Sequence, residues 1–305
     1  MSAKKNRIGR NEPTKSKGGE GLEPLSPRAS SANAPEIPKS PERIMIRVPA
    51  RHNSRLQQVV DRVNADVEIY TLWQVNNVNA VQRLGMSDHG PVHVQIVTNI
   101  ALKLLRLLGI KGVQPNIITD YNLTGYNLSG DDAEVIVLLA SLLHDLGMSI
   151  HRLDHEEYSL FLARPKIGEL LDGLYDVPIR SILTSEILHA IISHRAGGRP
   201  LTLEAGVVRV ADALDMAEGR TRIPFEAGQV NIHSVSARAI ERINIEEGTN
   251  KPIRILIKMN NAAGIFQVDE LLKDKLEASG LERYIEVEAL VEGETDKKLF
   301  KTLRL

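Results

Sequence analysis

The feature that most constrains the fold of this chain is an adjacent histidine and aspartate at the end of an apolar segment. His144 and Asp145 follow Val135–Leu143, in which Ser141 is the one polar residue. Burying an imidazole and a carboxylate among such neighbours costs several kcal/mol unless something compensates. The fold must therefore bring partners to this pair, and the partner that we expect is a metal ion.

The spacing of the pair also predicts where its helix ends. Two adjacent residues on a helix point about 100° apart, so both can reach one ion only near a helix end, where the backbone is adjustable. Gly147 supplies such an end. We therefore expect the helix to stop close to His144 and Asp145.

Composition narrows the chemistry of any metal site. The 305 residues include no cysteine, which excludes disulfides, thiolate zinc sites and cysteine nucleophiles. Metal ligands must then be histidine nitrogens and carboxylate oxygens. The hydrophobic content of 42% is typical of a globular core, and the net charge of -1 gives no clear signal for a nucleic-acid partner.

No uninterrupted apolar run approaches the roughly 18–20 residues that cross a bilayer, and the N-terminus lacks the apolar segment of a secretory signal. We therefore expect no membrane partner and a cytoplasmic location.

The chain divides into three parts by composition and periodicity. Residues 1–41 are rich in Lys, Arg, Ser, Pro and Gly, and we expect a disordered tail. Residues 42–224 carry helical apolar stripes and are expected to form an all-α core domain. The expected helices are Asn53–Ala65, Ile69–Leu84, Pro91–Leu108, Asp131–Leu146, His155–Leu171, Ile179–His194 and Thr202–Ala217.

After Pro224 the apolar period changes to two. Strands are expected around Val230–Ile232, Ile243–Ile245, Ile253–Ile257 and Ile285–Val291, with a helix near Ile265–Ala278. Residues 225–305 thus read as a small α+β domain with one sheet face covered, and the fold class is mainly α with this C-terminal addition. An open sheet edge suits dimerisation or regulation, so a homo-oligomer is a hypothesis.

One segment between the expected helices reads as a loop. Val113–Gly130 is rich in Asn and Gly and is long enough to cover a site, so a role as a lid is a hypothesis.

Two further helices carry polar residues that fit their surroundings poorly. His93 lies on an apolar stripe that points its ring at the core, and Asp212 lies in the apolar segment Val207–Leu214. With His144 and Asp145 they give two nitrogens and two carboxylates, a set suited to Mn, Fe, Mg, Ni or Zn. A single buried histidine is more often a hydrogen-bonded core residue, and Asp212 could be satisfied by Arg209 or a helix end.

The remaining histidines have weaker arguments. His155 and His194 could supply a second ion, because His194 continues an apolar stripe and His155 opens a helix soon after the pair. His89 and Asp215 are candidates for a nearby acid or base. We expect structural or surface roles for His151, His189 and His233. His52 precedes the expected core, and we assign it no role.

The order His93, His144-Asp145, Asp212 resembles the metal-binding signature of the HD superfamily of metal-dependent phosphohydrolases. The texts His-Asp-Leu-Gly and Val-Ala-Asp-Ala-Leu-Asp reinforce the similarity, which covers about His89–Arg222. The resemblance implies a helical domain, one or two divalent ions on these residues, and hydrolysis of phosphate esters of nucleotides or cyclic nucleotides. His155 and His194 look like the ligands of a second ion in two-metal members.

Two departures from the family pattern bear on activity. Some relatives carry a His-His pair where this chain has Ser193-His194, and many have a lysine where it has Met148. The resemblance therefore leaves a phosphate-contacting cation missing. Arg195, Arg199 and Arg220 are candidate substitutes, because guanidinium pairs with phosphate bidentately, although solvated loop arginines are equally expected.

Three functions remain in competition. The leading one is metal-assisted hydrolysis of a small phosphorylated substrate, a nucleotide by expectation, with Asp145 orienting or deprotonating the nucleophile. The second is a regulatory module that binds a nucleotide without turning it over. The third is oxidative, with a di-iron pair that requires both His155 and His194.

Overall fold

The computed structural model describes residues 43–122, 125–195, 197–216, 236, 238–291 and 302–304. Within the chain, Ile44–Leu305 form one compact unit. The expected disordered tail, the expected strand at Val230–Ile232, and the side chains of Arg220 and His233 lie outside the described residues.

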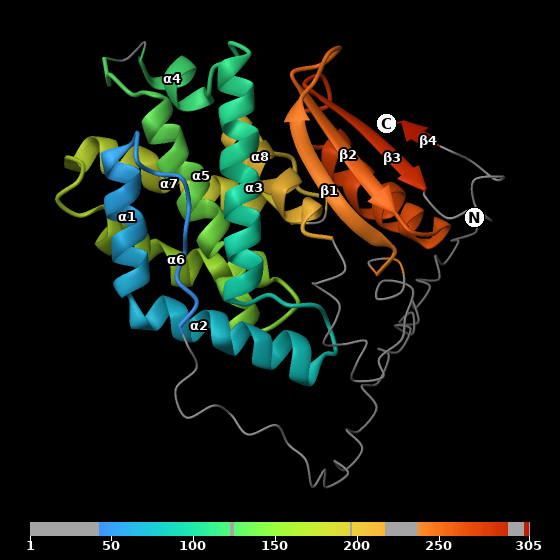
Figure 1. Cartoon of the computed structure of the whole chain (residues 1–305). Helices are drawn as coiled ribbons and strands as arrows, with labels where there is room; N and C mark the ends of the chain where they lie inside the picture. Colours follow the sequence, from blue (N-terminus) through green and yellow to red (C-terminus); the bar gives the residue numbers. More distant parts are fainter. Residues whose placement is uncertain are drawn as a thin grey trace, which may run out of the picture. The chain divides into compact units, whose positions relative to one another are not determined.

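The helices expected from the apolar stripes are present (Figure 1). Two expectations extend too far at the end: the helix expected at Asp131–Leu146 stops at Leu143, and the one expected at Thr202–Ala217 stops at Leu214. The helical elements are α1 (Ser54–Ala65), α2 (Val67–Asn77), η1 (Val78–Arg83), α3 (Pro91–Ile110), α4 (Asn116–Tyr121), α5 (Gly130–Leu143), η3 (Leu146–Ser149), α6 (His155–Leu171), α7 (Val177–Ser193) and α8 (Leu203–Leu214).

Polar residues fix the starts of these helices. The Asn53 side chain accepts a hydrogen bond from the backbone of Leu56 at the start of α1, and Asp66 does the same at the start of α2. Ser129 and Asp132 form a reciprocal capping box at the start of α5. These caps satisfy backbone N–H groups that have no partner within the helix, so each of these three helices begins at a defined residue.

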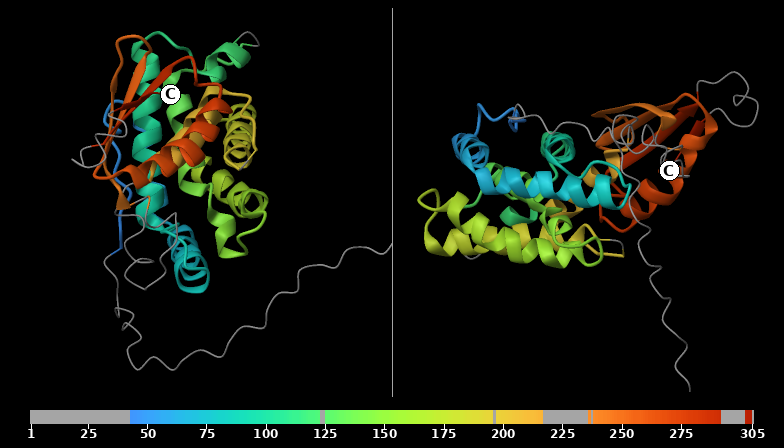
Figure 2. Two further views of the ribbon diagram at one scale, coloured as in Figure 1. Left: turned by 90° about the vertical axis from the view of Figure 1, so that its right-hand side faces the viewer. Right: turned by 90° about the horizontal axis from the view of Figure 1, so that it is seen from below.

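Helix α5 forms the centre of the core. From Asp132 to Leu143 each of its residues is buried, because it contacts α1, α3, α7 and α8 on different sides. Helix α2 runs across the lower end of the bundle (Figure 2). A helix covered on all sides is mainly apolar, and the buried polar residues of α5 are Asp132, Glu134 and Ser141.

Helix α3 is long and apolar enough to cross a membrane by length and composition, although polar residues such as Lys103 and Arg106 interrupt its apolar run. Its 20 residues have a mean hydropathy of 1.3, and 56% of the apolar window is buried inside the protein, mainly against α5 and α8. The packing accounts for the apolar composition without a bilayer.

The expectation of a lid at Val113–Gly130 is wrong. This segment follows the C-terminal end of α3 and contains α4, whereas His93 lies in the first turn of α3. The helix rises 1.5 Å per residue, so the two ends are about 25 Å apart. The Asn- and Gly-rich composition predicts a connecting segment, but composition does not determine at which end of the helical bundle that segment lies.

The C-terminal part is an α+β unit, as expected. Its sheet has the order β1 (Ile240–Glu247), β2 (Ile253–Met259), β3 (Ile285–Val291) and β4 (Thr302–Arg304). β2 and β3 are parallel, with Ile255 opposite Val287, and the other pairs are antiparallel.

The parallel pair needs a crossover, which contains η4 (Ala262–Gly264), η5 (Gln267–Lys273) and α11 (Asp274–Glu277). These helices lie over one face of the sheet (Figures 1 and 2), and side chains of β2 and β3 alternate between buried and half-buried. Helices η5 and α11 also contact α8, so the crossover joins the sheet to the helical core.

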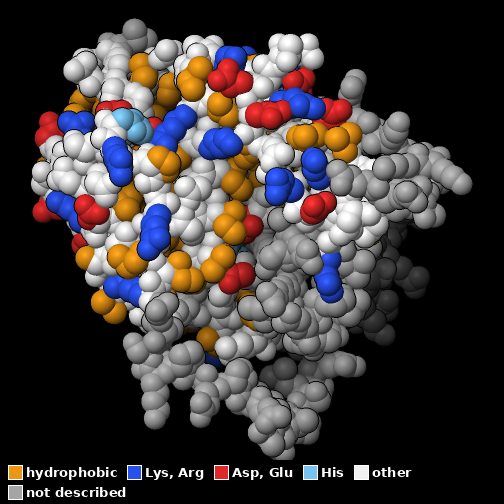
Figure 3. Space-filling model, viewed as in Figure 1, with side chains coloured by type: hydrophobic (Ala, Val, Ile, Leu, Met, Phe, Trp, Pro, Cys, Tyr) orange, Lys and Arg blue, Asp and Glu red, His pale blue; other side chains and the backbone are white. Residues whose placement is uncertain are grey.

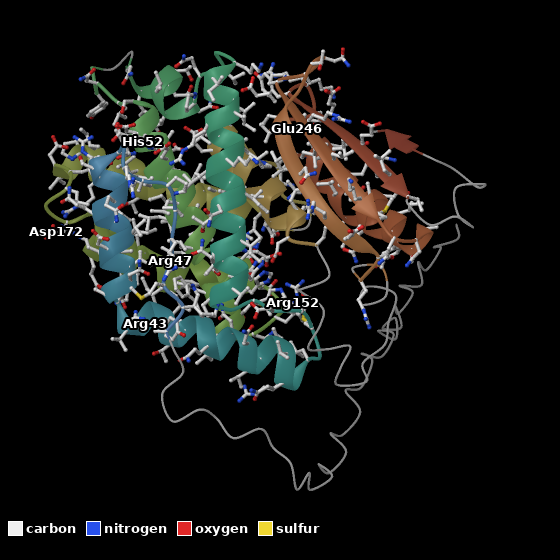
Figure 4. All side chains as sticks on the ribbon, in the orientation of Figure 1. Arg43, Arg47, His52, Arg152, Asp172 and Glu246 are labelled. Carbon is white, nitrogen blue, oxygen red and sulfur yellow. The ribbon has the colours of Figure 1, made fainter. Side chains whose placement is uncertain are left out.

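The buried carboxylate of Glu134 connects α1, α3 and α5, far from the end of the bundle that α2 crosses. Glu134 is 6% exposed and accepts hydrogen bonds from Arg106 and Asn53, and its oxygens lie 3.0 Å from His52 Nε2. Figure 4 labels His52, and Figure 3, in the same view, shows a pale-blue histidine side chain at the surface at the upper left, close to Lys and Arg side chains. Burial alone would raise the pKa of Glu134, but the hydrogen bonds from Arg106, His52 and Asn53 lower it.

We predict that Glu134→Gln lowers the free energy of unfolding by about 1–3 kcal/mol at pH 7, because a charged acceptor of several hydrogen bonds is lost. The folded pKa of Glu134 lies below its ordinary value of 4.5, so this contribution is full above that pH and disappears as pH falls further. Urea unfolding of both proteins at pH 7 and below pH 4.5 checks the prediction. A difference that grew with acidification would contradict it.

Candidate metal centre

Five helix ends converge at one place in the core. His93 lies in the first turn of α3, and His155 is the first residue of α6. The C-terminal ends of α5, α7 and α8 supply the rest, which are His144 and Asp145, His194, and Asp212. Helix ends have backbone groups that are not committed to the helix, so their side chains can turn toward a common point.

Four side-chain atoms form a first group of donors. His93 Nε2 and His144 Nε2 lie 3.3 Å apart, and they are 3.3 and 3.2 Å from Asp145 Oδ2. Asp212 Oδ1 completes the group at 3.6 and 3.8 Å from the two nitrogens. Donors about 2.0–2.2 Å from one ion are themselves separated by roughly 3–3.5 Å, so these spacings fit ligands of a single ion.

The second oxygen of Asp145 faces a second group. Asp145 Oδ1 lies 3.2 Å from His155 Nε2 and 3.6 Å from His194 Nε2. One carboxylate thus presents each oxygen to a different pair of histidines. This arrangement suits a carboxylate that bridges two ions.

The far ring nitrogens fix how each imidazole is oriented. His144 Nδ1 donates to the Ser141 carbonyl at 2.8 Å, and His194 Nδ1 donates to the Ile191 carbonyl at 2.6 Å. His93 Nδ1 lies 2.6 Å from Asp215 Oδ2. With hydrogen on Nδ1, each neutral ring turns an unprotonated Nε2 toward the carboxylates, the form that binds a metal.

His155 is held in a similar way by a more crowded environment. Its Nδ1 lies 2.9 Å from a Glu156 oxygen, 3.0 Å from the Arg152 carbonyl and 2.8 Å from Arg152 Nη1. Two acceptors against one donor favour hydrogen on Nδ1 and again leave Nε2 for the carboxylate side. Figure 4 labels Arg152, near the lower end of α3.

The electrostatics of the centre favour a positive charge. Burial alone would lower the pKa of His144, but Asp145 and Asp212 outweigh it and raise that pKa to about 10. Burial would raise the pKa of Asp145, but His144 holds it well below its usual range, and Lys275 with His144 does the same for Asp212. The site therefore holds a proton on His144 where a cation is absent.

Helix dipoles act in the same direction. Three of the converging ends are C-terminal, and each carries a partial negative charge worth about 0.3–1 kcal/mol to a nearby cation. The Nε2 atoms of His93 and His144 also face each other at 3.3 Å. A divalent ion bound there would replace the proton that His144 otherwise carries, so the residues present fit one.

Helix α2 and the helical turn η1 that follows it hold the backbone of the His-Asp segment in place. Trp73 Nε1 donates to the Leu142 carbonyl at 2.9 Å, and Asn76 Nδ2 donates to the Asp145 carbonyl at 3.0 Å and to the His89 carbonyl at 3.2 Å. Asn79 Nδ2 donates to the Met148 carbonyl at 2.7 Å. Sequence reasoning missed these residues, although their spacing of three was a signal for one helix face.

The turn after Asp145 is closed by Gly147. Its backbone N–H donates to Ser159 Oγ at 2.8 Å, and a Cβ at this position would lie 2.0 Å from the His155 carbonyl. Only glycine allows α6 to approach so closely and bring His155 to the centre. The neighbouring Met148 is fully buried, so this position presents no cation to a ligand.

The other residues proposed from sequence have varied positions. His89 is 7% exposed, its Nδ1 donates to the Ser87 carbonyl, and its ring centroid lies 5.5 Å from that of His93. Asp215 Oδ2 contacts Nδ1 of His93, the ring nitrogen opposite the one that faces Asp145. His151 and His189 each accept a hydrogen bond from loop backbone.

The two described candidate arginines are not aimed at the centre. Arg195 pairs with Glu157 at 2.9 Å and both side chains are exposed. Arg199 is exposed at the surface. A substitute for the cation missing at Met148 must therefore be sought elsewhere.

Residues 92–217, which include all six proposed ligands, match the family described as the HD domain. The chain belongs to this family, whose members are generally metal-dependent hydrolases that bind divalent ions. It is 41% identical over 249 residues to an uncharacterised protein of Methanocaldococcus jannaschii, a match that covers 82% of this chain and 93% of that protein.

More distant matches are to proteins named Ribonuclease Y. Identity is 25% over 231 residues with that of Desulforamulus reducens and 23% over 256 residues with that of Acholeplasma laidlawii. These matches cover 73% and 80% of this chain but 42% and 44% of the relatives, so the chain spans less than half of their length. No solved structure matches the chain.

We predict that Asn76→Ala weakens manganese binding by about 10–100-fold, because the backbone of Asp145 loses the donor that holds it. The unfolding free energy should fall by about 1–3 kcal/mol, since two buried carbonyls lose their partner. Calorimetric titration with Mn²⁺ and urea unfolding measure both effects. Asn99→Ala is the matched control on the outer face of α3; equal effects in both variants would contradict the assignment.

We also predict that His194→Ala reduces the bound metal from two ions to one per chain, because it removes a donor of the second group and leaves the first intact. Elemental analysis after gel filtration gives the ratio. His189→Ala, on the same helix, should keep both ions. A wild-type ratio of one, or loss of all metal in His194→Ala, would refute the two-group arrangement.

Proposed function

We propose that this protein is a metal-dependent phosphohydrolase that cleaves a phosphate ester, with a nucleotide or another phosphodiester as substrate. The observation that carries the proposal is the first group of donors: two imidazole nitrogens 3.3 Å apart, each of which lies 3.2–3.8 Å from two carboxylate oxygens. Such a mixed set is typical of ions that keep positions for water and substrate.

The donor distances support one assignment of ligands. His93, His144, Asp145 and Asp212 would hold one ion. Asp145, His155 and His194 would hold a second, although His194 also lies near His144 and Asp212. When bound, a divalent ion in such a site lowers the pKa of water and withdraws electron density from a phosphoryl oxygen. Mn, Mg, Fe, Ni and Zn all suit this donor set.

Asp145 serves as a ligand in this proposal. Each of its oxygens faces two histidine nitrogens, and the surrounding imidazoles hold its pKa well below the usual range although burial opposes this. A carboxylate in this state takes up a proton poorly near neutral pH. We therefore replace the expectation that Asp145 deprotonates the nucleophile with a role in holding the metal.

His89 is the better candidate for proton transfer. Its Nδ1 is occupied by the Ser87 carbonyl, so Nε2 is the atom that would accept or give a proton. It is nearly buried beside His93 and is not among the proposed ligands. Its place next to the first group supports a role in protonating the leaving oxygen.

An alternative is a regulatory module that binds a nucleotide without hydrolysis. The specific observation in its favour is Met148, which is buried at the position where many relatives carry a lysine. Tight nucleotide binding with no product, across Mn, Mg, Fe, Ni and Zn, would select this alternative. The oxidative function requires a di-iron pair, so elemental analysis that finds no iron in the active protein would eliminate it.

We predict that the Mn²⁺-loaded protein hydrolyses bis(p-nitrophenyl) phosphate, and that Asp145→Asn lowers kcat/KM at least about a hundredfold, because the bridging charge is lost. A short single-stranded RNA is the second substrate, since three relatives are named as ribonucleases. Asp120→Asn, an exposed change on α4, should keep full activity. Undiminished turnover by Asp145→Asn with unchanged helical content would refute the proposal.

A further inference from the structure

The C-terminal part of the chain places a cation at the metal centre. Lys275 lies on α11, outside the residues that match the HD domain, and its ammonium contacts Asp212 Oδ2. The other oxygen of Asp212 faces His93 and His144. Among the described Lys and Arg side chains, Lys275 is the one that contacts a proposed ligand carboxylate.

The docking of α11 on α8 holds this lysine in place. Gly206, Arg209 and Asp212 lie at intervals of three on one face of α8. A Cβ on Gly206 would lie 2.4 Å from the Ser279 carbonyl, so backbones meet there. The buried Arg209 donates to the Lys275 carbonyl at 3.2 Å and to the Ser193 carbonyl at 3.1 Å, which joins α11 to the end of α7.

The centre is most accessible on the side of this lysine. The side chains of His93, His144, Asp145, His155 and His194 are 0–5% exposed, whereas that of Asp212 is 12% exposed and that of Lys275 is 24% exposed. A ligand that enters from this side meets the ammonium next to the donors.

Two other cations lie near the centre, and neither contacts Asp212. Arg152 Nη1 lies 2.8 Å from Nδ1 and 3.4 Å from Nε2 of His155, so this guanidinium is placed at the second group of donors. Arg209 is committed to backbone carbonyls of three residues. In the described part of the chain, Asp212 is the partner of the Lys275 ammonium, which leaves two of its three hydrogens for a ligand.

We infer that Lys275 binds the phosphate group of the substrate, and so supplies from the C-terminal part the cation that Met148 does not provide. The inference rests on the proposed phosphohydrolase function. The ammonium lies beside a ligand of the first ion, on the accessible side, with donors to spare. A phosphate oxygen there would gain a charge-assisted hydrogen bond while Asp212 keeps its other oxygen toward the histidines.

The test uses the full chain loaded with Mn²⁺ and inorganic phosphate as the probe, measured by calorimetric titration. We predict that Lys275→Gln weakens phosphate binding at least about tenfold, the effect expected for a lost charge-assisted hydrogen bond. Affinity for Mn²⁺ should stay equal or rise, because the ammonium no longer competes for Asp212. Lys273→Gln, two residues earlier and paired with Asp269, should change neither affinity.

Each result is decisive. Unchanged phosphate affinity in Lys275→Gln would overturn the inference while leaving the proposed function intact, which the hydrolysis assay reports separately. A fall in Mn²⁺ affinity as large as that in phosphate affinity would mean that Lys275 only positions Asp212, and would also overturn it. If Lys275→Gln is poorly folded by circular dichroism, Lys275→Arg replaces it: retained phosphate binding supports the inference, and a full loss refutes it. Absence of phosphate binding by the wild type would overturn the inference, while the hydrolysis assay decides the proposed function.

Discussion

The rest of the structure depends on one buried carboxylate. Asp145 lies among four imidazole nitrogens in the interior, and each helix that carries one of them must end at that point. An uncompensated charge there would cost far more than any single apolar contact returns. The capped helix starts, the fully covered α5 and the close approach at Gly147 all serve to bring those ends together.

Much of this arrangement could be predicted from sequence, and the reason is physical. His93, His144 and Asp212 are polar residues on apolar helix faces, so they stand out against their neighbours. Helices followed from their 3.6-residue spacing, and the change to a period of two marked the α+β part. The resemblance to the HD superfamily then indicated that these residues, in this order, are metal ligands, which their spacing alone did not indicate.

What sequence could not provide were contacts between distant segments. Asn76 and Trp73 donate to carbonyls 69 positions along the chain, and an asparagine or tryptophan in a helix is no anomaly by itself. The composition of Val113–Gly130 indicates a loop, but it does not indicate that this loop lies at the C-terminal end of α3, far from His93. Lys275 stayed hidden for the same reason: nothing in its own segment indicates that α11 docks beside Asp212.

The span of the centre along the chain has a consequence for unfolding. The proposed ligands run from His93 to Asp212 and come from the ends of five helices, in a protein that has no cysteine. An ion bound there therefore acts as a reversible cross-link that exists only in the folded state. Binding raises the free energy of unfolding by RT ln(1 + [M]/Kd), where [M] is the concentration of free metal. The resistance of the protein to proteolysis therefore depends on the supply of metal around it.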